Sequence, residues 1–142
     1  MTEIITNSPD ETSALGKQIA KDLCVGSIVA LQGKLGSGKT NLTKGIAAGL
    51  GLTENLTSPT YTIINEYQRE SLPIFYHIDA YRLNTNRDFH DIGGLDIINS
   101  GGICVIEWSE RILESLPDEK IIISIEITGG SSRLITLRGG KW

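Results

Sequence analysis

The sequence is poor in cysteine, in long apolar runs and in basic charge. It has 2 cysteines in 142 residues, and neither Cys24 nor Cys104 belongs to a CxxC pair or a Cys/His cluster. This excludes a disulfide framework and a cysteine metal centre as organising features. We expect both side chains to be buried thiols, because free cysteine is among the most buried residue types.

Membrane segments and a secretory leader are missing as well. The longest apolar runs, at 102–108 and 121–127, are far shorter than the roughly 20 residues that a membrane span needs. The segment Met1–Ile4 lacks the basic and then apolar order of a signal peptide. We therefore expect a cytoplasmic protein without membrane contacts.

Basic charge is in deficit, since 13 Lys and Arg residues stand against 17 Asp and Glu residues and give a net charge of −4. A domain that grips nucleic acid through a basic face has the opposite balance. We therefore expect no DNA partner and only an indirect or local contact with RNA. Hydrophobic residues (39%) and charged residues (21%) have ordinary globular frequencies, and a chain of this length fits one compact domain over 1–142.

The first third of the chain predicts a helix, a strand and a second helix. The capping box Ser8–Glu11, with proline at the first helical position, predicts a helix over 9–24. The continuously apolar run 28–31 is typical of a parallel strand that is buried on both faces. Apolar residues then recur at helical spacing over 42–50.

Runs rich in β-branched and aromatic residues predict further strands at 61–67, 74–79, 103–107, 121–127 and 134–137. The last two strands should form a hairpin around Gly129 and Gly130. Short helical pieces are expected over 86–100, and Ser109 is expected to cap a short helix that ends before Pro117.

The residues between the first strand and its following helix satisfy the Walker A pattern: Gly33, Lys34, Leu35, Gly36, Ser37, Gly38, Lys39 and Thr40. Glycines allow positive φ, so consecutive amides can turn toward a β-phosphate at the positive end of the helix. Lys39 is expected to contact the β- and γ-phosphates, and Thr40 to bind Mg²⁺. The alternative is a glycine-rich turn that happens to precede a lysine, which the flanking strand and helix disfavour.

The motif predicts ATP with Mg²⁺ as the ligand. It also predicts a P-loop NTPase-like α/β fold, a three-layer sandwich with a mostly parallel central sheet and a C-terminal antiparallel hairpin.

Two predicted strands end in an acid. Four apolar residues precede Glu107, as in a Walker B strand, whereas the strand before Asp79 is less uniformly apolar. A P-loop ATPase needs such acids for Mg²⁺ and for the attacking water, so Lys39, Asp79 and Glu107 are the predicted catalytic residues, with Glu107 on the metal. The alternative for either acid is a salt bridge or a solvated strand end. Arg82 is an anion contact or the ion-pair partner of Asp79, and Trp108 is a core edge or a partner contact.

Hydroxyl side chains cluster at Thr57, Ser58 and Thr60. Many P-loop proteins place a loop that senses the γ-phosphate at this point of the chain, and an ordinary capped turn is the alternative. His77 and Tyr81 are expected to pack or to form hydrogen bonds rather than to catalyse.

With these segments placed, the chain resembles the TsaE (YjeE) family, the small ATPase of the bacterial system that installs threonylcarbamoyl on adenosine 37 of tRNA. The resemblance covers nearly the whole chain. The resemblance rests on four segments, namely residues 33–40, 57–62 with 65–67, 77–83 and 106–108. The Walker A motif alone is generic, whereas the other three segments, in this order and at these distances, are specific.

The resemblance implies a cytoplasmic ATPase that is weak by itself, acts on the complex of TsaB and TsaD, and meets tRNA through that complex. Lys39 and the loop amides would bind phosphate, and Thr40 and Glu107 would hold Mg²⁺. Asp79 would be the second acid needed for turnover.

The family also implies a switch loop over 57–60 and an adenine position near Thr12 and Arg133. There are departures from its pattern, since Lys34 replaces a frequent acid and Ser109 a frequent proline. These bear on partner contacts more than on ATP binding.

A small-molecule P-loop kinase is the alternative function, because the spacing of Asp79 and Arg82 could serve an acceptor hydroxyl. No helical stretch carries two arginines, as a kinase lid would, and the Asn-Lys-x-Asp motif of GTPases is missing. A binding module that never hydrolyses ATP is a third possibility, which holds if both acids are structural.

Overall fold

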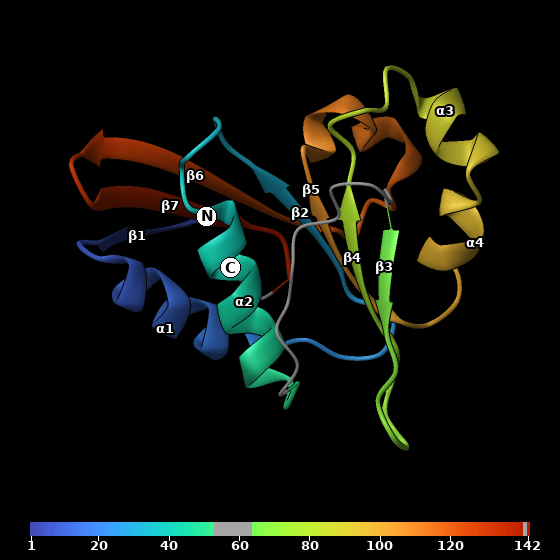
Figure 1. The fold of residues 1–142 in the computed structure, drawn as a ribbon, viewed down its shortest axis with the longest axis horizontal. Coiled ribbons are helices and arrows are strands. Elements are labelled where there is room, and N and C mark those ends of the chain that lie inside the picture. The colour runs from blue at the N-terminus through green and yellow to red at the C-terminus, as the bar shows by residue number, and fades with distance from the viewer. Residues whose placement is uncertain (53–63, 141) are drawn as a thin grey trace.

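A twisted sheet runs through the protein and carries helices on both faces (Figure 1). The computed structural model describes residues 1–52, 64–140 and 142. The strands are β1 (Thr2–Thr6), β2 (Ile28–Gln32), β3 (Ile64–Tyr67), β4 (Phe75–Asp79), β5 (Ile103–Glu107), β6 (Ile121–Gly129) and β7 (Ser132–Arg138). The α-helices are α1 (Pro9–Ala20), α2 (Lys39–Gly49), α3 (Asn86–Asp91) and α4 (Gly94–Ile98), and short 3₁₀ turns follow at Ser109–Arg111 and Leu113–Ser115.

The strand order is β1-β7-β6-β2-β5-β4-β3. The central pairs β6/β2, β2/β5 and β5/β4 are parallel, while β7/β6, β1/β7 and β3/β4 are antiparallel. The predicted parallel centre and C-terminal hairpin are therefore confirmed. The carboxyl ends of β2, β4 and β5 lie at one edge of the sheet, where α/β proteins bind their ligands.

Alternate residues of β2 enter two separate cores. Val29 and Leu31 pack with residues of α1 and α2, whereas Ile28 and Ala30 pack with residues of α3, α4 and the 3₁₀ turns. Because successive side chains of a strand point to opposite faces, a continuously apolar strand requires cover on both sides. This arrangement confirms the predicted three layers.

Helix α1 begins where its cap predicts and ends earlier than expected. The Ser8 hydroxyl accepts the amide of Glu11 at 3.1 Å, and the Glu11 carboxylate reaches the amide of Asn7, one residue before the Ser8 amide of a standard capping box. After Ala20 the chain continues in turns with hydrogen bonds of the i to i−3 type. The helix therefore stops four residues short of the predicted end.

One strand was missed and two local expectations were wrong. No strand was predicted at β1, an edge strand that pairs with β7, 126 or more residues away in the chain. Cys24 is exposed, because the early end of α1 leaves it in a loop, while Cys104 is buried as predicted. The Ser109 hydroxyl caps nothing and donates instead to the carbonyl of Leu31 at 3.0 Å.

Candidate phosphate-binding site

The glycine-rich loop joins the carboxyl end of β2 to the amino end of α2. Gly36 and Gly38 have φ of 78° and 105°, which is the left-handed region that favours glycine. Gly38 is the N-cap of α2, and the helix start has neither a side-chain cap nor an acid in its first turn. The first amides of α2 therefore present an uncapped positive end to the solvent side of the loop, the arrangement that binds phosphate in other proteins.

Close packing fixes the loop to the C-terminal hairpin. A Cβ added to Gly33 would lie 2.6 Å from the Ser37 Oγ and 2.9 Å from the Ile125 carbonyl oxygen. The guanidinium of Arg133 donates to the carbonyl oxygen of Ser37 and to that of Gly130, each at 2.8 Å. Strands β6 and β7 thus hold the loop from one side.

Lys39 lies across the floor of the loop. Its ammonium donates to the Gly33 carbonyl oxygen at 2.7 Å and stands 3.4 Å from the centre of the Trp108 ring. Burial lowers the pKa of Lys39, and the carboxylates of Glu107, Glu110 and Asp79 oppose this shift. Trp108 has a positive φ of 58°, so the chain turns sharply after β5 to bring the ring to the lysine. The sequence left the role of Trp108 open, and the structure places it in the site.

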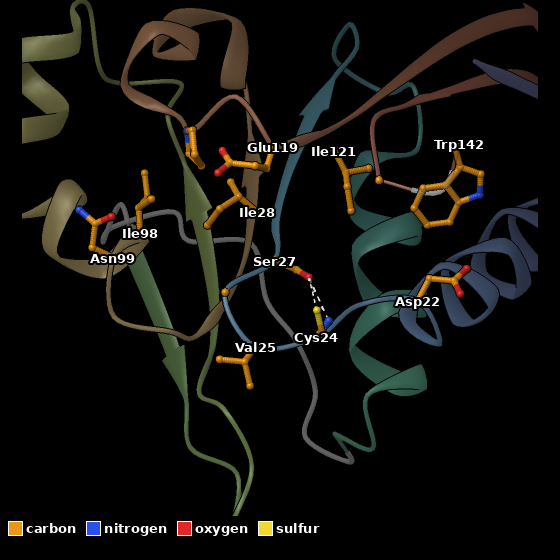
Figure 2. Close-up of a pocket in the computed structure, with 13 residues that line it drawn as sticks. Asp22, Cys24, Val25, Ser27, Ile28, Ile98, Asn99, Glu119, Ile121 and Trp142 are labelled. Atoms are coloured by element: carbon orange, nitrogen blue, oxygen red, sulfur yellow. Dashed lines mark hydrogen bonds between the residues drawn. The ribbon is translucent and has the colours of Figure 1, made fainter.

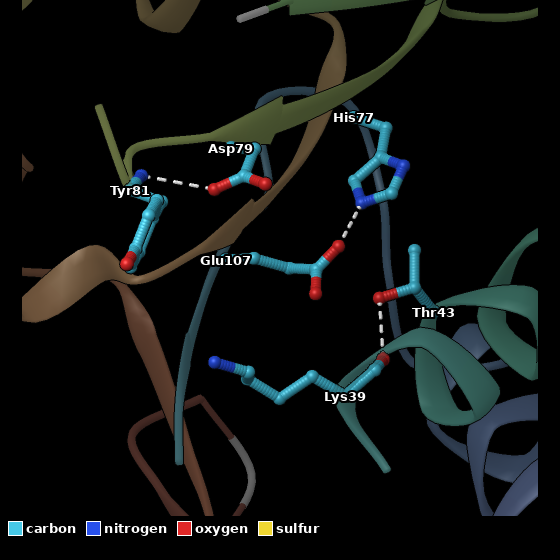
Figure 3. Close-up of polar contacts among 6 residues, drawn as sticks. All are labelled: Lys39, Thr43, His77, Asp79, Tyr81 and Glu107. Atoms are coloured by element: carbon cyan, nitrogen blue, oxygen red, sulfur yellow. Dashed lines mark hydrogen bonds and ion pairs between the residues drawn. The ribbon is translucent and has the colours of Figure 1, made fainter. Parts of the chain in front are cut away.

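The two strand-end acids lie side by side. Asp79 and Glu107 are register neighbours on the parallel strands β4 and β5. One Asp79 oxygen accepts the amide of Tyr81 at 2.9 Å (Figure 3). Burial is the largest influence on the pKa of Asp79 and raises it, while the Tyr81 hydrogen bond lowers it. Within the described residues Arg82 makes no ion pair with Asp79, so the pairing alternative for that arginine is wrong.

A buried histidine contacts the second acid. His77 has no exposed surface, and its Nε2 meets the Oε2 of Glu107, which is 5% exposed. The prediction that His77 forms a hydrogen bond is confirmed, but its partner was not foreseen. The spacing of His77 and Asp79, two apart on one strand, places both on the same face of the sheet as Glu107.

The loop and the acids enclose one cavity of about 420 Å³, within the range of ligand sites. Its lining residues are Leu35, Gly36, Gly38, Lys39, Thr40, Asn41, Asp79, Glu107 and Trp108. The structure thus brings the predicted phosphate loop, Thr40 and both acids together. Lys34 is exposed and is not among the residues that line this cavity.

Thr12 and Arg133 line a second, small cavity of about 40 Å³ together with Ser37 and Gly38. Thr12 is buried, and its hydroxyl forms a 2.8 Å hydrogen bond with the hydroxyl of Thr6. These two predicted adenine contacts therefore lie next to each other and beside the loop. The predicted switch residues Thr57, Ser58 and Thr60 lie outside the described residues.

A third cavity of about 430 Å³ lies at the amino ends of β2 and β6, and includes Cys24, Ile28, Ile121 and Trp142 (Figure 2). It contains none of the predicted site residues. Over the described chain, no three His, Cys, Asp or Glu side chains gather as a metal-binding group. Among the same residues, no helix has the length and apolar character that crossing a membrane requires.

Comparison with known proteins gives consistent matches. The family model described as "Threonylcarbamoyl adenosine biosynthesis protein TsaE" matches residues 6–135. The chain is 40% identical over 133 residues to "tRNA threonylcarbamoyladenosine biosynthesis protein TsaE" of Treponema pallidum (strain Nichols), covering 94% of this chain and 97% of that protein. It is 42% identical over 131 residues to the protein of the same name from Bacillus subtilis (strain 168), covering 92% and 81%.

The crystal structure of Bacillus subtilis YdiB has a similar fold, with a TM-score of 0.80 and 37% identity over 98% of this chain and 85% of that one. The family match spans the glycine loop and both strand-end acids. Fold and sequence therefore agree, and the chain belongs to the TsaE family.

Proposed function

We propose that this protein binds ATP with Mg²⁺, hydrolyses it slowly, and serves the threonylcarbamoyl modification of adenosine 37 in tRNA together with TsaB and TsaD. One observation carries the proposal: the uncapped start of α2 and two strand-end carboxylates meet at a single cavity. The names of the relatives support the place in tRNA modification. With a net charge of −4, the protein would meet tRNA through its partners.

The loop would bind the triphosphate. The first amides of α2 and of the glycines before it would supply the hydrogen bonds, with the positive end of the helix behind them. Lys39 would exchange the Gly33 carbonyl oxygen for phosphate oxygens, since both are acceptors and the side chain already lines the cavity. Thr12 and Arg133 would lie near the adenine of the bound ATP. The small cavity that they line shares Gly38 with the larger cavity, in which the phosphates would bind.

The two acids would position the metal ion and the attacking water. Thr40 and Glu107 would hold Mg²⁺, and their hydroxyl and carboxylate oxygens fit this hard cation, which usually takes few protein ligands beside phosphate oxygens. When bound, Mg²⁺ neutralises charge that develops on the phosphates. One Asp79 oxygen accepts a hydrogen bond from the Tyr81 amide. The other oxygen would orient the water that attacks the γ-phosphorus and displaces ADP.

The test is phosphate release from purified protein, alone and with TsaB and TsaD. We expect slow release that rises when the partners are added. Glu107→Gln should reduce it by about 100-fold, because a neutral amide is a weaker ligand for Mg²⁺ than a carboxylate. Glu114→Gln, an exposed acid on the second 3₁₀ turn, is the matched control and should leave the rate unchanged.

Two outcomes would reject the proposal. Unchanged release in Glu107→Gln would remove Glu107 from its role. Transfer of labelled γ-phosphate to a metabolite, with none to water, would establish the small-molecule kinase instead. Formation of threonylcarbamoyladenosine by TsaB and TsaD, measured with and without this protein, tests the cellular role separately from hydrolysis.

A further inference from the structure

The His77 contact with Glu107 is the feature that the proposed roles leave unused. Phe75, His77 and Asp79 lie on the face of β4 toward α2. Along this face Phe75 belongs to the core, His77 makes a buried polar contact with Glu107, and Asp79 lines the open cavity. His77 lies between Phe75 and Asp79 on this face and is fully buried. A side chain in that place cannot reach a nucleotide, and it reaches Glu107 instead.

The contact constrains one oxygen of Glu107. A carboxylate only accepts hydrogen bonds, so the imidazole Nε2 carries the hydrogen that joins it to Oε2. The other oxygen points away from His77, on the side of Lys39 (Figure 3). The Nδ1 of His77 has no hydrogen-bond partner among the described residues.

Glu107 needs such a constraint. Glutamate has three side-chain torsions, and the last is broad and roughly two-fold. Asp79, its neighbour across the strands, is shorter and is held by the amide of Tyr81. No hydrogen bond other than that from His77 is found for the Glu107 carboxylate within 1–52, 64–140 and 142.

We propose that His77 is a positioning residue that fixes the Glu107 carboxylate with one free oxygen toward the phosphate-binding loop. The inference rests on the proposed function for its effect on turnover, but the contact itself can be tested without ATP. In other proteins, groups that orient a metal-binding or catalytic residue change affinity or activity by about 10- to 100-fold when removed.

His77→Gln and His77→Asn form the matched pair. Both introduce an amide of similar polarity, but only glutamine is long enough to place an N–H near the position of Nε2. We expect His77→Asn to lower kcat for phosphate release by about 10-fold or more with KM for ATP within twofold, and His77→Gln to restore most of the loss. In a Glu107→Gln background, His77→Asn should have little further effect, because the two residues act as a unit.

Two readouts do not depend on turnover. Histidine ring NMR of the nucleotide-free protein should show a protected Nε2 hydrogen for His77 that is lost or shifted in Glu107→Ala. His90, the only other histidine, contacts Ser115 and should not change. Mn²⁺ affinity in the presence of ADP should fall in His77→Asn and recover in His77→Gln.

The outcomes separate this inference from the proposed function. If the natural chain releases no phosphate, the proposed ATPase fails, while NMR and Mn²⁺ binding still decide the role of His77. If the His77 signal is the same in Glu107→Ala, or if glutamine and asparagine behave alike at this position, the positioning role is wrong. If His77→Asn does not fold, the NMR comparison of the natural chain with Glu107→Ala decides whether His77 contacts Glu107.

Discussion

Replacing Gly45 with alanine tests how closely α1 and α2 must approach for the phosphate loop to keep its place. Gly45 faces α1, and an added Cβ would lie 2.1 Å from the carbonyl oxygen of Ser13 and 2.9 Å from its carbonyl carbon. Both atoms are helix backbone, so no side chain can turn aside. Gly16 makes the reciprocal approach, since its Cβ would lie 2.5 Å from the carbonyl oxygen of Leu42.

The expected cost follows from two opposing terms. Forcing an extra carbon into a packed contact costs about 1–3 kcal/mol, and a clash with backbone belongs at the upper end. Alanine recovers about 1 kcal/mol of helix propensity over glycine. We expect Gly45→Ala to lower the free energy of unfolding by about 2 kcal/mol, or Tm by roughly 4–8 °C for a domain of this size.

Thermal unfolding followed by circular dichroism measures this change, and Gly129→Ala is the control. A Cβ at Gly129 meets nothing within 4 Å, so its effect should stay within about 0.5 kcal/mol. Because α2 begins at Lys39, separation of the helices should also weaken ATP binding measured by calorimetry. An unchanged or raised Tm for Gly45→Ala would refute the close helix contact.

Two further predictions concern ionisable groups. Burial raises the pKa of Asp79 above its unfolded value, so the charged form destabilises the fold above the folded pKa, and this penalty disappears as the pH falls through that pKa. Asp79→Asn should therefore raise Tm at pH 7 by more than at acid pH, relative to the exposed control Asp118→Asn, and equal gains at both would contradict this. Burial raises the pKa of Cys104 to about 12, so iodoacetamide should modify only the exposed Cys24 in the native protein at pH 8 and both thiols after unfolding. Similar native rates for the two cysteines would show that Cys104 is accessible.

Features set by neighbouring residues could be predicted from the sequence. The start of α1 is fixed by Ser8 and Pro9, and the loop before α2 by its glycines, so both were placed correctly. Asp79 and Glu107 were each predicted at the end of a strand, and because parallel strands end at the same edge of a sheet, both could be expected near the glycine loop. Their direct adjacency depends on the pairing of β4 with β5. The fold class was predictable for the same reason, because strand β2 is apolar on both faces.

Features that depend on pairing between distant segments could not be predicted. Strand β1 has little pattern of its own and exists because β7 offers it a partner. The contact of His77 with Glu107 needs the register of β4 against β5 as well as the direction of each side chain. Periodicity could place His77 on the correct face, but it could not choose the atom that the ring would meet.

The contacts of Lys39 give a physical reason to expect modest ATP affinity from the chain alone. In the proposed complex with ATP, its hydrogen bond to the Gly33 carbonyl oxygen would be exchanged for one to phosphate, and the ammonium would move away from the Trp108 ring. A hydrogen bond to a charged group contributes about 1.5–3 kcal/mol and a cation–π contact about 0.5–2 kcal/mol. The new contacts between Lys39 and phosphate must first offset the free energy of these two lost contacts. A partner that moved Trp108 away from Lys39 would remove part of that cost, so the position of this ring links the proposed nucleotide site to the proposed stimulation by TsaB and TsaD.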